Sequence, residues 1–375
     1  MAAGRLSSAV LLLLNMAGAL LAPRGALHPG PPAAVAEDDA DVEFFFFPFL
    51  VLYKSGRVQR FMGTDTVPAA TDPATGVASR DVVVDAAAGL AVRLYLPSLA
   101  TNSTAVGAEG GRLPLVVFYH GGAFVTESAF SPTYHRYLNT LASRARVLAV
   151  SVEYHLAPER RLPTGYDDAW AALRWALADA RSTGPGAGAD PWLSRHADPA
   201  RLFLAGDSAG GNIAHNMAMR AGREGLEGGA AIRGLALLDP FFWGKRPVPS
   251  ETRDEDTRRW RERTWSFVCA GRYGIDDPVI NPVAMPPKEW RRLASARVLV
   301  TVAGLDMLSA RGRAYVRALR ESGWRGEAEL YETPGEQHVY FLDKPDSEKA
   351  AKEMEVVVDF IKGGQGSSTS LSMDE

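Results

Sequence analysis

Residues 202–211 are Leu202-Phe203-Leu204-Ala205-Gly206-Asp207-Ser208-Ala209-Gly210-Gly211. The stretch joins a short apolar strand, 202–205, to a helical segment that runs from Ala209 to Ala221. Small residues on both sides of Ser208 allow a sharp strand-to-helix turn that lifts its hydroxyl above a sheet. The helix that follows directs its N-terminal amides at a developing negative charge. The pattern therefore predicts Ser208 as a nucleophile and an α/β fold around it.

Apolar strands and helical segments alternate on both sides of this turn. The sequence predicts strands at 82–85, 90–95, 115–119, 147–152, 202–205, 232–238, 298–302 and 328–331, and helices at 166–180, 209–221, 308–322 and 347–362. Most of these strands are apolar on both faces, as strands of a covered parallel sheet are. The alternation predicts an α/β fold, with a mostly parallel central sheet and helices on both faces.

Changes in composition divide the chain into three parts. Residues 1–40 are rich in Ala and Pro and are expected to form a leader or a disordered extension, and the Ser/Gly-rich residues 363–375 a disordered tail. Residues 41–362 are expected to form one α/β domain. Within it, 41–60 hold an aromatic run, and 241–290 hold several tryptophans without a strand pattern. We expect these two segments to form a small, partly helical cap.

The N-terminus has features of a secretory signal peptide. Arg5 precedes the apolar run 11–14, and small residues at 17–19 offer a cleavage site. The apolar stretch is interrupted and is shorter than the ~20 residues that a membrane span needs, so no stable span is expected. A signal peptide within residues 1–22 and an uncleaved extension are equal alternatives. The glycosylation sequon at Asn102 matters only for a secreted chain.

The overall composition excludes several classes of protein. The chain has 375 residues, a net charge of -3 and a sequence pI of about 6.2, which argues against a nucleic-acid partner. It contains a single cysteine, Cys269, so it has no intrachain disulfide and no cysteine-rich zinc cluster. Apolar neighbours indicate that Cys269 is a buried residue rather than a nucleophile.

A glycine-rich turn follows the strand 115–119. Its sequence is His120-Gly121-Gly122-Ala123-Phe124. Acyl transfer passes through an oxyanion that needs N–H donors fixed in advance, and glycines let backbone amides approach a substrate closely. The turn predicts one source of these donors, and the amide of Ala209 is the other. His120 is expected to hold the loop through a ring hydrogen bond rather than to act as a base.

A serine nucleophile needs a base and an orienting carboxylate, which in this kind of fold follow it along the chain. His338 lies in a turn-rich loop after the strand 328–331, whereas His215 lies within a helix and is expected to be packed. Asp306 follows the strand 298–302, at the sheet edge where α/β sites form. Asp239, which also ends a strand, and Asp276 are competitors for the same role. The order along the chain favours Ser208, Asp306 and His338.

These motifs together resemble the plant carboxylesterase family, in the hormone-sensitive-lipase-like group of the α/β-hydrolases. The resemblance also includes residues 151–159, in which Glu153 and Glu159 are expected to brace the site through a hydrogen-bonded turn. It covers most of the chain, from 47–57 to the last helix. The family's third oxyanion-loop glycine is Ala123 here, and its usual Arg is His155.

The resemblance implies the α/β-hydrolase fold and hydrolysis of small-molecule esters with short acyl chains, without a cofactor or metal. It also implies that Gly121, Gly122 and Ala209 supply the oxyanion hole, and it favours a cytoplasmic location. Three alternatives stay open. The gibberellin receptors look similar but lack the histidine that is present here as His338. Isoflavanone dehydratases reuse the same residues on a flavonoid, and an acyltransferase needs only an alcohol in place of water.

Overall fold

The structure is a computed structural model that describes residues 41–99, 111–182 and 188–363. The predicted leader, the sequon at Asn102 and the tail beyond Gly363 lie outside these ranges. No helix within them is both long enough and apolar enough to cross a membrane.

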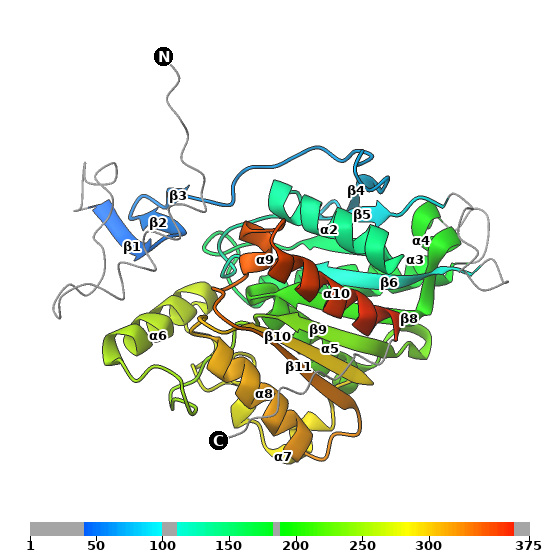
Figure 1. Cartoon of the computed structure of the whole chain (residues 1–375). Helices are drawn as coiled ribbons and strands as arrows, with labels where there is room; N and C mark the ends of the chain where they lie inside the picture. The colour runs from blue at the N-terminus through cyan, green and yellow to red at the C-terminus, as the bar shows by residue number, and fades with distance from the viewer. Residues whose placement is uncertain (1–40, 100–110, 183–187, 364–375) are drawn as a thin grey trace.

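Eight strands form the central sheet (Figure 1). They are β4 (Ala78–Asp85), β5 (Leu90–Leu96), β6 (Leu113–Tyr119), β7 (Leu148–Glu153), β8 (Ala197–Asp207), β9 (Ile232–Leu238), β10 (Arg297–Ala303) and β11 (Glu327–Thr333). The order across the sheet is β11-β10-β9-β8-β6-β7-β5-β4. Neighbours from β11 to β7 are parallel, whereas β5 is antiparallel to both β7 and β4. The predicted mostly parallel sheet is confirmed.

Helices cover both faces of this sheet (Figure 1). One face carries α2 (Pro132–Ala145), α9 (Tyr340–Asp343) and α10 (Glu348–Lys362), and the other carries α3 (Thr164–Arg181), α5 (Ala209–Glu224) and α8 (Ser309–Glu321). The short helices α4 (Pro191–His196) and α7 (Pro287–Trp290) lie in connections.

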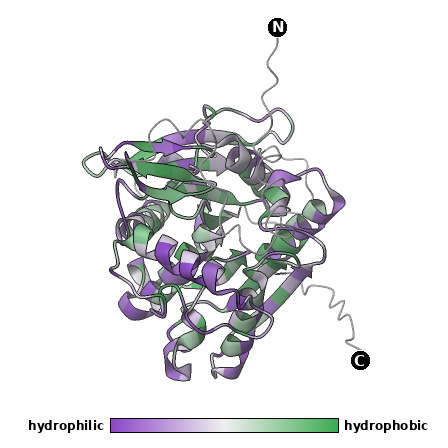
Figure 2. Ribbon diagram, turned by 90° about the vertical axis from the view of Figure 1, so that its left-hand side faces the viewer, coloured by the Kyte–Doolittle hydropathy of each residue, from purple (hydrophilic) through white to green (hydrophobic). Residues whose placement is uncertain are grey.

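Alternate residues of β6 show how the strands serve both layers. Val116 and Phe118 join the hydrophobic cluster under α2 and α10, and Leu115 and Val117 join the one under α3 and α5. All four side chains are fully buried. Figure 2 shows hydrophobic residues concentrated along the strands, whereas the helices carry both kinds. Burial of both sheet faces explains why these strands are apolar throughout.

A second, three-stranded antiparallel sheet lies beside helix α6 (Glu255–Cys269) (Figure 1). It consists of β1 (Val42–Phe46), β2 (Leu50–Tyr53) and β3 (Val58–Arg60). The ring of Phe44 in β1 stacks on Phe267 of α6, with ring centroids 4.1 Å apart. Phe46 is buried and Phe44 half-buried, so the aromatic run packs against the helix of the tryptophan-rich segment.

The register of the parallel strands aligns their carboxyl ends. Tyr119 pairs with Gly206, Asp207 with Leu238, and Leu238 with Thr301, while β11 ends opposite Ala303. The loops that follow β6, β8, β9, β10 and β11 therefore leave the sheet at one edge. That edge is where ligands bind in open α/β sheets.

Candidate active site

Ser208 occupies the sharp turn between β8 and α5. Its backbone has φ 50° and ψ -117°, a conformation that residues with a side chain seldom adopt. A Cβ added to Gly206 would overlap the backbone of Gly210, and one added to Gly210 would overlap the carbonyl of Tyr119. Both glycines are therefore needed for the close approach of helix, turn and strand. The turn is further held by a hydrogen bond from the Ser208 amide to the carbonyl of Leu238 (2.9 Å).

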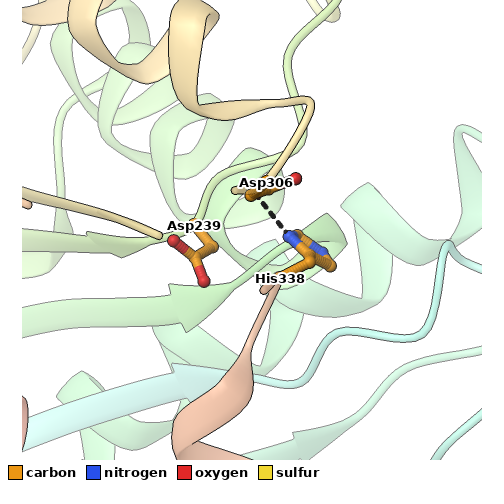
Figure 3. Close-up of side chains that lie close together, drawn as sticks. All are labelled: Asp239, Asp306 and His338. Atoms are coloured by element: carbon orange, nitrogen blue, oxygen red, sulfur yellow. Dashed lines mark hydrogen bonds and ion pairs between the residues drawn. The ribbon is translucent and has the colours of Figure 1, made fainter. Parts of the chain in front are cut away.

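A chain of hydrogen bonds joins Ser208, His338 and Asp306. His338 Nε2 lies 2.8 Å from Ser208 Oγ, and His338 Nδ1 lies 2.7 Å from Asp306 Oδ2. Figure 3 shows the second of these bonds. The other oxygen of Asp306 accepts from the amide of Leu308 (2.9 Å), which fixes the carboxylate. The structure thus brings together the three residues predicted from the order along the chain.

The charges around His338 favour its protonated form. Burial lowers the pKa of His338, but the neighbouring carboxylate of Asp306, with smaller contributions from Asp239 and Asp207, raises the pKa to about 9. The Asp306 carboxyl is buried, and the ring of His338 keeps 24% of its side-chain surface exposed. A carboxylate at Nδ1 orients the imidazole and stabilises the imidazolium that forms when it takes a proton.

Asp239 lies beside this chain but contacts backbone rather than the imidazole ring (Figure 3). Its carboxylate accepts from the amide of Ala303 (2.8 Å) and from that of Val339 (2.7 Å). One donor ends the strand before Asp306, and the other follows His338. The sequence offered Asp239 as a competitor for the carboxylate that orients His338. Its contacts instead place it to position the loops that carry Asp306 and His338.

Asp239, Asp306 and His338 are also a group of potential metal ligands, with atoms within 4.8 Å of one another. The nitrogen and oxygen atoms of these three residues already make hydrogen bonds to one another, to Ser208 or to backbone amides. Burial and the nearby Asp306 charge raise the pKa of Asp239 well above its usual value. The arrangement suits proton transfer more than metal binding.

The oxyanion loop departs from the expectation at one residue. The amide of Gly121 donates to Tyr134 Oη (2.8 Å) and to Asp207 Oδ1 (3.0 Å), so it is already engaged. The amides of Gly122, Ala123 and Ala209 donate to no acceptor among the described residues. This argues against Gly121 as an oxyanion donor, because a backbone N–H held by a buried carboxylate is not free for a substrate.

Asp207 and Tyr134 are buried neighbours of the site that the sequence interpretation missed. Asp207 Oδ2 accepts from Tyr134 Oη (2.8 Å), and with the Gly121 contact it joins the nucleophile turn to the oxyanion loop. Burial raises the pKa of Asp207 to about 7. The signal for Asp207 was its place next to Ser208. Tyr134 lies on α2, a helix that the sequence interpretation did not include.

Three other predictions concern the surroundings of the site. His120 Nδ1 donates to the carbonyl of Gly121 (2.8 Å), so its ring holds the loop as predicted. His215 is buried and contacts Tyr315 Oη (3.0 Å), as expected for a packed residue. Glu153 accepts from Ser128 Oγ (2.8 Å) and the amide of Ala129 (2.6 Å), which braces the segment after the oxyanion loop.

A cavity of about 710 Å³ lies elsewhere on the molecule. It is lined by Arg291, residues 293–296 and residues 323–326. These residues precede β10 and β11, so the cavity lies at the amino ends of the strands. It is therefore at the opposite edge of the sheet from Ser208.

Comparisons with known proteins agree with this geometry. Residues 116–342 match the model of a protein family whose description is "alpha/beta hydrolase fold". A probable carboxylesterase 5 of Arabidopsis thaliana is 42% identical over 87% of this chain and 100% of its own length. A 2-hydroxyisoflavanone dehydratase of Glycyrrhiza echinata is 42% identical over 84% of this chain and 94% of its own. A solved esterase of the archaeon Pyrobaculum calidifontis has a TM-score of 0.59 at 25% identity, covering 76% of this chain and 83% of that one.

The chain therefore belongs to the α/β-hydrolase fold family. Within that family it is a member of the plant carboxylesterase group, an enzyme that hydrolyses carboxylic esters of small molecules.

Proposed function

We propose that this carboxylesterase works through an acyl-enzyme on Ser208, with His338 as general base and Asp306 as the residue that orients it. His338 takes the proton of Ser208 Oγ as the oxygen attacks the ester carbonyl. It then returns the proton to the alkoxide that leaves as the alcohol. Water enters, gives a proton to His338 and hydrolyses the acyl-enzyme, which releases the acid and restores Ser208.

The observation that carries the proposal is the continuous hydrogen-bond chain from Ser208 Oγ through His338 to Asp306. A serine hydroxyl is a weak nucleophile unless a base is within hydrogen-bonding reach, and 2.8 Å meets that condition.

Charge on the carbonyl oxygen needs donors that are fixed before the reaction. We assign this role to the amides of Gly122, Ala123 and Ala209, in place of the Gly121, Gly122 and Ala209 expected from the family resemblance. Gly121 instead holds the loop to Asp207. Ala123 has φ 54° and Gly122 has φ 97°, so the loop bends at these two residues.

Labelling with a fluorophosphonate probe, followed by mass spectrometry of the modified peptide, tests the proposal. We expect modification at Ser208, its loss in Ser208→Ala, and strongly slowed labelling in His338→Ala. Hydrolysis of 4-nitrophenyl butyrate is expected to fall by about 10⁶-fold in either variant with the fold retained. Near-normal hydrolysis by folded Ser208→Ala would refute the assignment.

The similarity to a 2-hydroxyisoflavanone dehydratase favours one second activity, elimination of water from a flavonoid. In that reaction His338 would move a proton, and no covalent bond to Ser208 would form. Incubation with 2-hydroxyisoflavanone distinguishes the two. A dehydrated product without fluorophosphonate labelling would support the lyase, and labelling with ester turnover supports the esterase.

A further inference from the structure

One edge of helix α6 spans the site from the oxyanion loop to the triad acid. The ring of Trp265 packs against Phe124 of the oxyanion loop, with ring centroids 6.2 Å apart. Arg261 precedes Trp265 by four residues and therefore shares its side of the helix. Its Nη2 lies 2.7 Å from Sδ of Met307, the residue that follows Asp306.

Among the described residues, Arg261 and Arg263 of α6 have no acidic partner, and of these two only Arg261 is half-buried. Arg258 pairs with the buried Glu251 and donates to backbone carbonyls, and Arg259 pairs with Glu255 and Asp256. Within the described parts of the chain, Arg261 makes no ion pair. Its contacts are the Met307 sulfur and the face of Trp243, at 5.9 Å.

The guanidinium of Arg261 therefore makes fewer polar contacts than a half-buried arginine usually does. The residue is half-buried, and burial lowers the pKa of Arg261 while the charge of Asp306 opposes that change. A guanidinium offers five N–H donors, and a thioether is only a weak acceptor for one of them. A partly desolvated arginine is usually paired with a carboxylate or phosphate. The donors of Arg261 that lack an acidic partner lie beside Met307, the residue next to Asp306.

The surrounding charge sharpens this point. The negative charge of Asp306 acts on both His338 and Arg261, and it disfavours an anionic ligand on this side of the site. The positive charge of Arg261, beside Met307, offsets this negative potential.

From this geometry we infer that Arg261 binds a carboxylate of the substrate, so that the enzyme prefers esters of which one half carries a carboxylate group. The inference rests on the proposed function, because it adds selectivity to the same serine site. Arg261 is a specificity-determining residue and takes no part in bond making.

Two matched pairs of esters test the inference. One pair is 4-nitrophenyl butyrate and mono-4-nitrophenyl glutarate, in which the acyl half is neutral or carries a carboxylate. The other pair is methyl 4-butyryloxybenzoate and 4-butyryloxybenzoate, in which the alcohol half differs in the same way. The proteins are the wild-type full chain, Arg261→Gln, Arg261→Lys and, as a control on the same helix, Arg259→Gln.

We expect Arg261→Gln to lower kcat/KM for at least one carboxylate ester by about ten- to a hundredfold, the range of a lost charged hydrogen bond. The loss for both neutral esters should be much smaller, within about threefold of wild type, because these esters offer Arg261 no carboxylate to bind. Arg261→Lys should keep part of the preference, and Arg259→Gln all of it. Glutarate should inhibit the wild type competitively and Arg261→Gln much less.

Equal losses of kcat/KM on all four esters, or no loss on any, would overturn the inference. Both outcomes mean that Arg261 does not distinguish charged from neutral substrates. Normal turnover of the neutral esters serves as the control for folding of Arg261→Gln. Failure of the proposed function is distinct, because it would appear in the wild type as absent fluorophosphonate labelling and absent hydrolysis of the neutral esters.

Discussion

At the scale of single residues, the nucleophile turn is held by a carboxylate that does no chemistry itself. Asp207 accepts from the Gly121 amide and from Tyr134 Oη, so it couples the turn that carries Ser208 to the loop that carries the oxyanion donors. A buried carboxylate that accepts two hydrogen bonds is a rigid link. Errors of a few tenths of an ångström in donor placement matter, because oxyanion stabilisation depends on fixed geometry.

Substitution of this link is expected to affect the rate more than binding. In Asp207→Ala the amide of Gly121 loses its carboxylate partner and the loop shifts. We expect kcat for 4-nitrophenyl butyrate to fall by about 10²-fold, the effect of losing one oxyanion donor, with KM changed little. Stopped-flow measurement of acylation gives the rate directly. Tyr134→Phe, which keeps the Gly121–Asp207 bond, should lose less, and an equal loss would contradict this account.

The pH dependence of activity tests the charges around His338. Only the neutral imidazole accepts the serine proton, and the pKa of His338 is raised to about 9. We therefore expect kcat/KM to rise with pH and to level off well above the usual histidine pKa of about 6.5. Ionised Asp239 is one of the groups that raise the pKa of His338, so in Asp239→Asn the rise should move to lower pH. An unchanged profile in a folded, active Asp239→Asn would show that Asp239 has no electrostatic effect on the base.

At the scale of elements, the contact between β1 and α6 joins two segments far apart in the chain. Phe44 stacks on Phe267, while its neighbour Phe45 points to the other side of the strand, toward Phe61. Alternation along a strand therefore gives one aromatic ring to α6 and the next to the small sheet. Phe46 also packs against Trp260 and Phe267 of α6, so Phe44 is one of two β1 rings that hold this helix in place.

Phe44→Ala is expected to loosen α6. The half-buried ring should contribute about 2 kcal/mol to the free energy of unfolding, less than a fully buried phenylalanine. Urea unfolding followed by tryptophan fluorescence measures the change, and KM for esters should rise as α6 becomes less fixed. Phe45→Ala is the matched control, with a similar loss of area but no contact to α6. Equal effects of the two variants on KM would contradict the role given to Phe44.

The sequence predicted the strands of the central sheet and four long helices, because their apolar periodicity is strong. It did not predict α2, since the buried side of that helix uses Tyr134, Tyr137 and Asn139 as well as leucines. It predicted Ser208, Asp306 and His338 as the residues that meet, because order along the chain and strand ends decide their place. The Gly121 amide, expected as an oxyanion donor, is engaged by Asp207 and by Tyr134, and Tyr134 lies on the helix that was missed.

At the scale of the whole molecule, three titratable groups make the folded state less stable as the pH rises. Burial raises the pKa of Asp207 and Glu353 to about 7, and the pKa of His338 is about 9. Each group binds its proton more tightly in the folded state than in the unfolded state. The stability that each contributes is present below its unfolded pKa and is lost as pH rises through its folded pKa. Activity and stability are therefore expected to change in opposite directions between pH 5 and 9.

Glu353→Gln tests this opposition without altering the triad. Glu353 is buried on α10, where its Oε1 accepts from Thr301 Oγ1 (2.8 Å), a bond that glutamine can keep. Glutamine does not ionise, so between pH 5 and 7, where Glu353 contributes, the variant should lose less unfolding free energy than the wild type. From pH 7 to 9, where His338 dominates, the unfolding free energies of the two proteins should fall in parallel. Urea midpoints at half-unit pH steps measure both curves, and kcat/KM should be unaffected. Parallel curves over the whole range would mean that Glu353 titrates normally in the folded protein, and that its burial on α10 does not limit alkaline stability.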